Sequence, residues 1–181
     1  FVKPSSNGSS VGVNRARRNN IIEAIEEAFK YDNKVVIEEE IKGIELEVSI
    51  IGNESPIASL PGSYTSQAEL LDYDAKYNDT TIVKNSPHPL DETTTKKIRE
   101  LALDAYIAAG CKGFARVDSF MDKDGNFYVN EINTYPGMTK TSLFADLWQV
   151  TDGTTFPQLL DKLIDYAIDK FEKESSIKRG R

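Results

Sequence analysis

The sequence predicts an α+β fold of two lobes, each built from antiparallel strands and helices, and three observations carry this prediction. The N-terminal part, up to Ile51, contains one helical pattern followed by two strand-like runs. Residues 53–61 are rich in Asn, Ser, Pro and Gly, which indicates a lobe boundary. Beyond them, two helical patterns flank a strong hairpin signal. We therefore expect a small lobe over residues 1–54 and a second lobe over residues 55–181.

The expected small lobe contains three strand segments. Phe1–Pro4 reads as the end of a strand whose earlier residues are missing, so we expect a fold that is incomplete at its N-terminus. Val35–Ile37 and Leu46–Ile51 are strand-like, and Lys42-Gly43 separates them. The order of elements after the first strand is therefore loop, helix, strand, turn and strand.

Three helices are predicted from apolar residues that recur at helical spacing. Asn20 and the acid three residues after it resemble a capping box at the start of the first helix. Asp91 can cap the second helix, and Gly110 is its stop signal. Thr155 and Pro157 open the third. The inward faces are expected to be Ile21, Ile22, Ile25, Ala28 and Phe29; Ile98, Leu101, Ala102, Ala105, Tyr106 and Ala109; and Leu159, Leu160, Leu163, Ile164, Ala167, Ile168 and Phe171.

A long polar stretch, residues 62–89, lies between the expected lobe boundary and the second helix. Stretches of this length without regular structure are usually functional or disordered. Tyr64, Tyr73 and Tyr77 make pure disorder less attractive, so a binding loop is favoured.

Overall composition limits the classes of protein to consider. The 181 residues carry a formal net charge of -7, with 39% hydrophobic and 28% charged residues, as in an ordinary globular protein. This charge gives no electrostatic footprint for nucleic acid or for an anionic membrane surface. A single cysteine, Cys111, cannot form an internal disulfide, and no apolar run approaches the ~18 residues of a membrane span. We expect a cytoplasmic protein with small-molecule partners.

A β-hairpin is predicted from Gly113–Met121 and Phe127–Asn133, which flank a turn at residues 122–126. With Asp122 opposite Phe127, the register can be worked out residue by residue. Because side chains alternate between the two faces of a strand, the facing pairs all lie on one face of the sheet. These expected pairs are Phe120 with Val129, Asp118 with Glu131, and Arg116 with Asn133.

The expected pairs bring two acids, an amide and an arginine together. Directly opposed carboxylates such as Asp118 and Glu131 repel each other, so the arrangement requires a compensating cation. Hard oxygen ligands without histidine or thiol favour magnesium over zinc. The alternative is a charged hairpin face exposed to solvent, which is common for such a pattern taken alone.

Two segments around the hairpin carry a resemblance to a known family. The strand Gly-Phe-Ala-Arg-Val-Asp, residues 113–118, and the segment Asn-Glu-Ile-Asn-Thr-Tyr-Pro-Gly-Met-Thr, residues 130–139, resemble the ATP-grasp superfamily and specifically the D-alanine–D-alanine ligases. The likeness extends over nearly the whole chain. Further matching segments are Phe1–Pro4, Gly8–Gly12, Ile37–Glu39, Gly43–Glu47 and Asp72–Tyr77.

The resemblance implies an ATP-grasp fold in which two α+β lobes grip ATP. It also implies a reaction that joins two D-alanines for the cell wall. Because a free carboxylate is a poor electrophile, the first D-alanine would be phosphorylated to an acyl phosphate, and the amine of the second would displace phosphate. The implied cofactors are ATP and two magnesium ions, or manganese in their place.

By the same resemblance, the nucleotide would contact residues from several segments. Lys3 would contact the phosphates, and the Gly/Ser loop with Ser9 and Ser10 would close over them. The adenine would lie against Glu38, Glu39 and Ile41, the ribose against Glu45, and Lys76 on the closing loop would reach the γ-phosphate. Taken alone, the loop could equally be a solvated Gly/Ser segment, and Glu45 part of a solvated acidic edge.

The resemblance assigns metal and substrate contacts to the second lobe. Asp118, Glu131 and Asn133 match the magnesium ligands. Arg116 would stabilise the acyl phosphate and the tetrahedral intermediate, with the Gly137 amide as an oxyanion donor. The carboxylate of the second substrate would bind Ser142 and the Leu143 amide, although Ser142 also reads as a helix N-cap. Tyr77 would hydrogen-bond Ser9 to hold loop and lid shut.

Some expectations stay open at the level of sequence. The second substrate could be D-lactate or D-serine instead of D-alanine, and a nucleotide-binding module without catalysis is a further alternative. The family's N-terminal substrate domain has no counterpart here, so the fragment is expected to be inactive alone and a homodimer would form through that missing part. Ser119 stands where the family usually has an aromatic residue, and residues 60–67 depart from the usual loop pattern.

Overall fold

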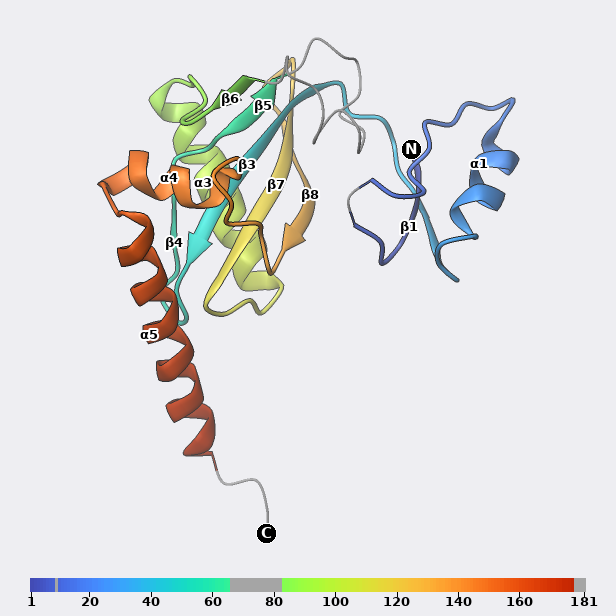
Figure 1. Ribbon diagram of the computed structural model, residues 1–181. Coiled ribbons are helices and arrows are strands. Elements are labelled where there is room, and N and C mark those ends of the chain that lie inside the picture. The colour runs from blue at the N-terminus through green and yellow to red at the C-terminus, as the bar shows by residue number, and fades with distance from the viewer. Residues whose placement is uncertain (9, 66–82, 178–181) are drawn as a thin grey trace. The chain divides into compact units, whose positions relative to one another are not determined.

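The computed structural model describes residues 1–8, 10–65 and 83–177, and these fall into two compact units (Figure 1). The first contains Phe1–Ile41, and the second contains Lys42–Thr65 and the residues from Lys84 onward. This division differs from the boundary that we expected between residues 54 and 55. The reason is that Gly43–Ile51 pairs along its whole length with a strand of the second unit.

The first unit is a two-stranded antiparallel sheet packed against one helix. Strand β1 (Val2–Pro4) pairs with β2 (Val35–Ile37), so both short strands that the sequence predicts are present. Helix α1 (Ile21–Ala28) also forms as predicted. Its small core is formed by Val2, Ala24 and Ala28.

Two details of α1 differ from the prediction. Asn20 is the N-cap, but its side chain makes no capping hydrogen bond. Its Oδ1 instead accepts a hydrogen bond of 2.6 Å from the backbone N–H of Arg17, so the predicted capping box is absent. Ile22 and Phe29, expected to face inward, are 64% and 51% exposed, because the two-stranded sheet is too narrow to cover them.

The second unit is organised around a four-stranded antiparallel sheet in the order β4-β3-β7-β8. Its strands are β3 (Gly43–Ile51), β4 (Ile57–Ala58), β7 (Phe114–Asp122) and β8 (Phe127–Asn133). Strand β3 begins three residues earlier than Leu46, because its start pairs with the end of β7 at Asp122. The two long strands β3 and β7 thus lie at the centre of the sheet.

Helix α3 (Glu92–Ala108) packs against the sheet by its apolar residues. As predicted, Asp91 caps it, and the Asp91 carboxylate accepts a hydrogen bond of 3.0 Å from the backbone N–H of Thr94. Ala109, expected on the buried side, is exposed. The shared core consists of Leu46, Val48, Ile50, Ala58, Ile98, Ala102, Tyr106, Ala115 and Val117. The strand residues in this core alternate with the polar residues of the opposite face.

Two further helices form a separate core at the end of β3. Helix α4 (Leu143–Asp152) and helix α5 (Phe156–Ser175) enclose Ile51, Phe144, Trp148, Leu159 and Leu163. A capping box joins Thr155 and Gln158 at the start of α5. The predicted inward face of α5 is only partly buried. Leu160, Ile164, Ala167, Ile168 and Phe171 are exposed, since the C-terminal half of α5 extends past the sheet (Figure 1).

Two short strands lie within the long polar stretch, residues 62–89. Strand β5 (Ser63–Thr65) pairs with β6 (Val83–Asn85), and the residues between them lie outside the described part of the chain. The predicted binding loop, with Tyr73 and Tyr77, therefore stays a prediction. In the described residues, no helix combines the length and apolarity needed to cross a membrane.

Candidate functional site

The hairpin β7–β8 aligns the predicted polar residues as the alternation of side chains requires. Arg116 pairs with Asn133, and Asp118 pairs with Glu131, both as predicted. Towards the turn the prediction is wrong by one residue. Phe120 faces Tyr128 and not Val129, because the register shifts between Asp118 and Ser119. This bulge leaves the pairs at the polar end unchanged.

The same face of the sheet continues onto β3. Glu47 of β3 pairs with Asp118, which pairs in turn with Glu131, so three carboxylates form one row across three strands. We call Glu47, Asp118 and Glu131 the charged row. Glu45 lies two residues before Glu47, opposite Phe120. Because the core under α3 takes the alternate residues of β3 and β7, the charged row lies on the face turned away from α3.

Arg116 neutralises the buried part of this row. Its Nε and Nη2 atoms donate to the two carboxylate oxygens of Asp118, each at 2.6 Å. Its Nε also lies 3.2 Å from Oε2 of Glu47. The Asp118 side chain is 3% exposed and that of Arg116 16%. Burial alone would lower the pKa of Arg116, but the Asp118 hydrogen bonds and the charges of Asp118, Glu47 and Glu131 raise it, so the guanidinium stays charged.

The donor set fits a hard divalent cation. Asp118 and Glu131 offer carboxylate oxygens from adjacent strands, and Asn133 adds an amide. The Asn133 Oδ1 atom accepts a hydrogen bond of 3.1 Å from the backbone N–H of Tyr135, which orients the amide. Within the described residues, no three His, Cys, Asp or Glu side chains are grouped as ligands for a metal. A magnesium site here would accordingly rely on two acids and the amide.

The segment between β8 and α4 carries the residues predicted for the second substrate. Ser142 is the N-cap of α4, and its Oγ lies 2.9 Å from the Thr139 Oγ1 and accepts from the Thr139 N–H at 3.2 Å. A Cβ at Gly137 would lie 3.0 Å from the same Ser142 Oγ, so glycine allows this close approach. The segment thus presents a hydroxyl next to the start of a helix, where anions bind favourably.

Residues of β5 and β6 contact the segment between β8 and α4 through hydrogen bonds. The Tyr64 hydroxyl donates to the carbonyl of Thr141 at 2.6 Å. The Lys84 ammonium donates to the carbonyl of Lys140 at 3.1 Å and pairs with Asp146. Burial first, and then the charge of Glu47, raise the pKa of Tyr64 to about 12, so its hydroxyl remains a donor at neutral pH.

The residues predicted for the nucleotide are divided between the two units. Lys3, Ser10, Glu38, Glu39 and Ile41 belong to the first unit, and Glu45 belongs to the second. In the first unit, the Lys3 ammonium lies 2.8 Å from Oε2 of Glu38. Ser10 has a positive φ of 58°, which is uncommon outside glycine. Ser9 and Lys76, also predicted for the nucleotide, and Tyr77, predicted to bond Ser9, lie outside the described residues.

Sequence reasoning missed three residues that contact the site. Glu47 could have been found from the alternation of Glu45 and Glu47 with Leu46 and Val48, which puts both acids on one face. Tyr64 was noted only as one of three tyrosines that favour a binding loop, and Lys84 carries no signal, because the contacts of both depend on strands that meet only in the folded protein.

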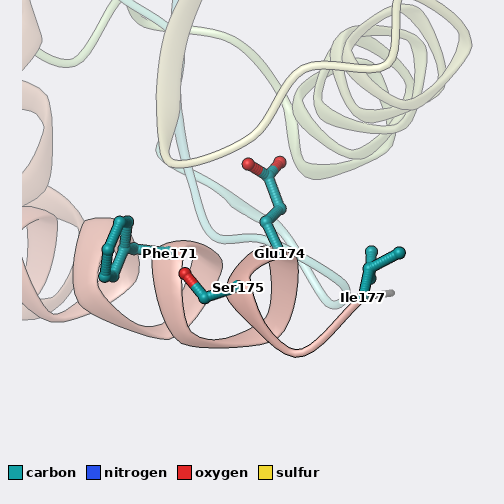
Figure 2. Close-up of a pocket in the computed structure, with 4 residues that line it drawn as sticks. All are labelled: Phe171, Glu174, Ser175 and Ile177. Carbon is teal, nitrogen blue, oxygen red and sulfur yellow. The ribbon is translucent and has the colours of Figure 1, made fainter. Parts of the chain in front are cut away.

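A pocket at the end of α5 is separate from these residues. Figure 2 shows the side chains that line it, Phe171, Glu174, Ser175 and Ile177. None of the predicted site residues contributes to its described lining, and it contains no cluster of polar groups comparable to the charged row. We therefore assign it no part in catalysis.

Known proteins are similar in sequence to this chain over most of its length. Residues 1–165 match the family described as "D-ala D-ala ligase C-terminus". D-alanine–D-alanine ligases of Finegoldia magna and Acetivibrio thermocellus are 44% and 45% identical, over 100% and 94% of this chain. The same alignments cover 52% and 46% of those proteins. The chain thus spans about half the length of the curated relatives it matches.

Solved structures are similar in fold as well. The D-alanine–D-alanine ligase from Coxiella burnetii has a TM-score of 0.84 at 35% identity, covering 97% of this chain and 46% of that chain. The VanG D-Ala:D-Ser ligase from Enterococcus faecalis has a TM-score of 0.81 at 35% identity, covering 92% and 48%. These likenesses confirm the predicted α+β fold of the ATP-grasp type.

Proposed function

The chain belongs to the family described as the D-ala D-ala ligase C-terminus, and from this premise we propose that the protein joins two D-alanines in an ATP-dependent ligation. The product, D-alanyl-D-alanine, would serve peptidoglycan synthesis in the cytoplasm. The single observation that carries the proposal is the register of Asp118 with Glu131 and of Arg116 with Asn133 on one sheet face. The names of the relatives support the choice of D-alanine.

Asp118, Glu131 and Asn133 would hold the magnesium ions. The burial of Asp118 and the oxygen-only donor set support this assignment. Bound magnesium would neutralise the negative charge of the ATP phosphates. Manganese, which accepts similar oxygen ligands, would be able to replace it.

Arg116 would act on the negative charge that develops during the reaction. In the proposed sequence, a carboxylate oxygen of the first D-alanine attacks the γ-phosphorus, ADP leaves, and an acyl phosphate results. The amine of the second D-alanine then attacks the carbonyl carbon and loses a proton, and phosphate departs with the electrons of the C–O bond. A guanidinium that is held rigidly and always charged is suited to stabilise both the acyl phosphate and the tetrahedral intermediate.

The other predicted residues would bind the substrates. Gly137 would donate its N–H to the oxyanion, and Ser142 with the Leu143 amide would bind the carboxylate of the second D-alanine. The nucleotide would contact Lys3, Ser9, Ser10, Glu38, Glu39, Ile41, Glu45 and Lys76, and Tyr77 would bond Ser9 on closure. A homodimer is a further expectation, and no nucleic acid or membrane partner is proposed.

Glu131→Gln tests the proposal directly, in the protein purified as its gene encodes it. We expect phosphate release that depends on ATP and D-alanine to fall by about 100-fold or more, because a proposed magnesium ligand loses its charge while the side-chain volume is kept. Electron paramagnetic resonance should show weaker Mn²⁺ binding in the same variant. Glu54→Gln is the matched control, since Glu54 is an exposed acid paired with Lys112 at 2.9 Å.

Two results would contradict the proposal in different ways. Full activity of the Glu131→Gln variant would remove the metal assignment while leaving the ligase in place. ATP binding without any D-alanine-dependent turnover by the unaltered protein would instead favour a nucleotide-binding module without catalysis.

D-serine is the second candidate for the acceptor substrate. The observation that favours it is the TM-score of 0.81 with the VanG D-Ala:D-Ser ligase. A competition assay that offers D-alanine, D-serine and D-lactate together would identify the acceptor from the product formed. A predominance of D-alanyl-D-serine or D-alanyl-D-lactate would replace the proposed product but keep the acyl phosphate chemistry.

A further inference from the structure

Glu47 lies at the β3 end of the charged row, with its side chain 12% exposed. Its backbone is fixed on both sides. It pairs with Asp118 of β7, and it exchanges two backbone hydrogen bonds with Gly62, of 2.8 and 2.9 Å. A buried ionised carboxylate is costly unless a cation compensates it. The sheet therefore holds this carboxylate at a fixed position beside a positive charge.

That positive charge is Arg116, which lies between two acids. It donates to Asp118 through Nε and Nη2, both at 2.6 Å, and its Nε is 3.2 Å from Glu47. Asp118 is also a proposed magnesium ligand, so its oxygens would be shared between the guanidinium and the ion. Glu47 has no such second task in the proposed reaction.

We propose that Glu47 is a positioning residue, which holds the Arg116 guanidinium in place when Asp118 serves the metal. This inference rests on the proposed function. Its physical basis is that planar arginine groups are oriented by the carboxylates they contact, and two anchors on different strands restrict the guanidinium more than one. Arg116 would then face the reacting phosphate and carbonyl groups in one orientation throughout the reaction.

Glu47→Gln tests this role, because it removes the charge and keeps the volume. We expect the kcat of ATP- and D-alanine-dependent phosphate release to fall about 10- to 100-fold, as is typical when a residue that orients a site residue is lost. KM for ATP should change by less than about twofold, since Glu47 has no proposed contact with ATP and its loss would not weaken binding in the ground state. Glu47→Asp should recover part of kcat, and Glu54→Gln, an exposed acid in the same unit, should behave as the unaltered protein.

Two further measurements separate positioning from a general structural role. When Arg116 is already replaced by Lys, adding Glu47→Gln should lower kcat little further, because the guanidinium that Glu47 orients is already absent. In protein without nucleotide or metal, the Nε–H of Arg116 should exchange with solvent at least about tenfold faster in Glu47→Gln, since the negative charge that lies 3.2 Å from Nε and helps to hold the guanidinium against Asp118 is lost. This second readout does not depend on activity.

The outcomes distinguish this inference from the proposed function. If the unaltered protein releases no phosphate with ATP and D-alanine, the proposed function fails. If the unaltered protein is active and Glu47→Gln matches Glu54→Gln, the positioning role is wrong. It is equally overturned if the effects of Glu47→Gln and Arg116→Lys add in full, or if excess Mg²⁺ restores kcat, which would make Glu47 a metal ligand. Should Glu47→Gln fail to fold, the kcat of Glu47→Asp decides, and an unchanged value overturns the inference.

Discussion

The two units hold their charged residues in different ways. In the second unit, Arg116 and Asp118 lie on the central strand β7, and their side chains are 16% and 3% exposed. In the first unit, Lys3 and Glu38 form an ion pair of 2.8 Å at the end of a short sheet, with 25% and 39% exposed. Both pairs consist of a predicted site cation and an acid. Only the first is shielded from water.

The length of strand pairing accounts for the difference. β7 pairs with β3 over nine positions, from Gly43 with Asp122 to Ile51 with Phe114, whereas β1 and β2 share three. Strands that pair over many positions fix the positions of their side chains. Strands that pair over only a few positions leave their side chains freer to move. We infer that the proposed metal and transition-state groups are pre-organised by the fold, and that the residues of the first unit proposed to contact the nucleotide adapt to their ligand.

The largest effect is expected from removing each cation in turn. Arg116→Met should lower the free energy of unfolding of the second unit by about 3–5 kcal/mol, because Asp118 would remain buried without its partner. Lys3→Met should cost about 0–1 kcal/mol, as for other exposed pairs. Trp148, the single tryptophan, is buried in the second unit, so its fluorescence in urea reports the first variant.

Amide hydrogen exchange in β1 and β2 reports the Lys3→Met variant. Arg116→Lys serves as the control for charge, and it should fall between the unaltered protein and Arg116→Met. Equal losses for Arg116→Met and Lys3→Met would refute the view that only the second unit depends on its ion pair.

A smaller effect is expected for buried and exposed tyrosines. The hydroxyl of Tyr106 on α3 donates to the carbonyl of Gly52 at 2.8 Å, and the side chain is fully buried. Tyr106→Phe should therefore cost about 1–3 kcal/mol, since the Gly52 carbonyl loses its buried donor. Tyr31→Phe, at a side chain 48% exposed in the first unit, should stay within about 0.5 kcal/mol. Urea unfolding followed by far-ultraviolet circular dichroism compares the two, and a reversed order would contradict the contrast.

Sequence patterns were sufficient for the polar end of the hairpin. The pairs Asp118 with Glu131 and Arg116 with Asn133 follow from strand alternation and a hairpin turn, which are both local properties. The bulge after Asp118 was not predictable in the same way. An extra residue in β8 changes the pairing of Phe120, and no particular residue type in the sequence indicates that a bulge is present.

Properties that depend on a partner element were missed for a related reason. Periodicity placed the apolar residues of α5 on one face, but of these only Leu159 and Leu163 are buried. Ile164 and Phe171 are 57% and 71% exposed, because nothing in the pattern specifies how far the sheet reaches. Alternation places Glu47 on the polar face of its strand, but its role was missed because its ion pair with Arg116, about 70 positions later in the chain, depends on the pairing of β3 with β7. The roles of Ser9, Lys76 and Tyr77 remain predictions.

The smallest effect concerns the helix caps of the two units. In α3 the hydrogen bonds from the Thr94 hydroxyl and N–H lower the pKa of Asp91 below its ordinary value of 3.8. The stabilisation that the ionised Asp91 carboxylate gives the folded state is therefore complete above about pH 4. It is lost as pH falls through the lower pKa of Asp91 in the folded state. Asp91→Asn keeps a capping side chain that does not titrate in this range.

We therefore expect the Thr94 amide chemical shift to move between pH 5 and pH 2 in the unaltered protein and to stay constant in Asp91→Asn. In the first unit, Asn20 makes no capping bond, so Asn20→Ala should leave the hydrogen exchange of α1 nearly unchanged. A clear loss of protection in α1 would mean that Asn20 stabilises the helix through its bond to Arg17. The contrast between the units would then lie in the strands alone, because helix caps would matter equally in both.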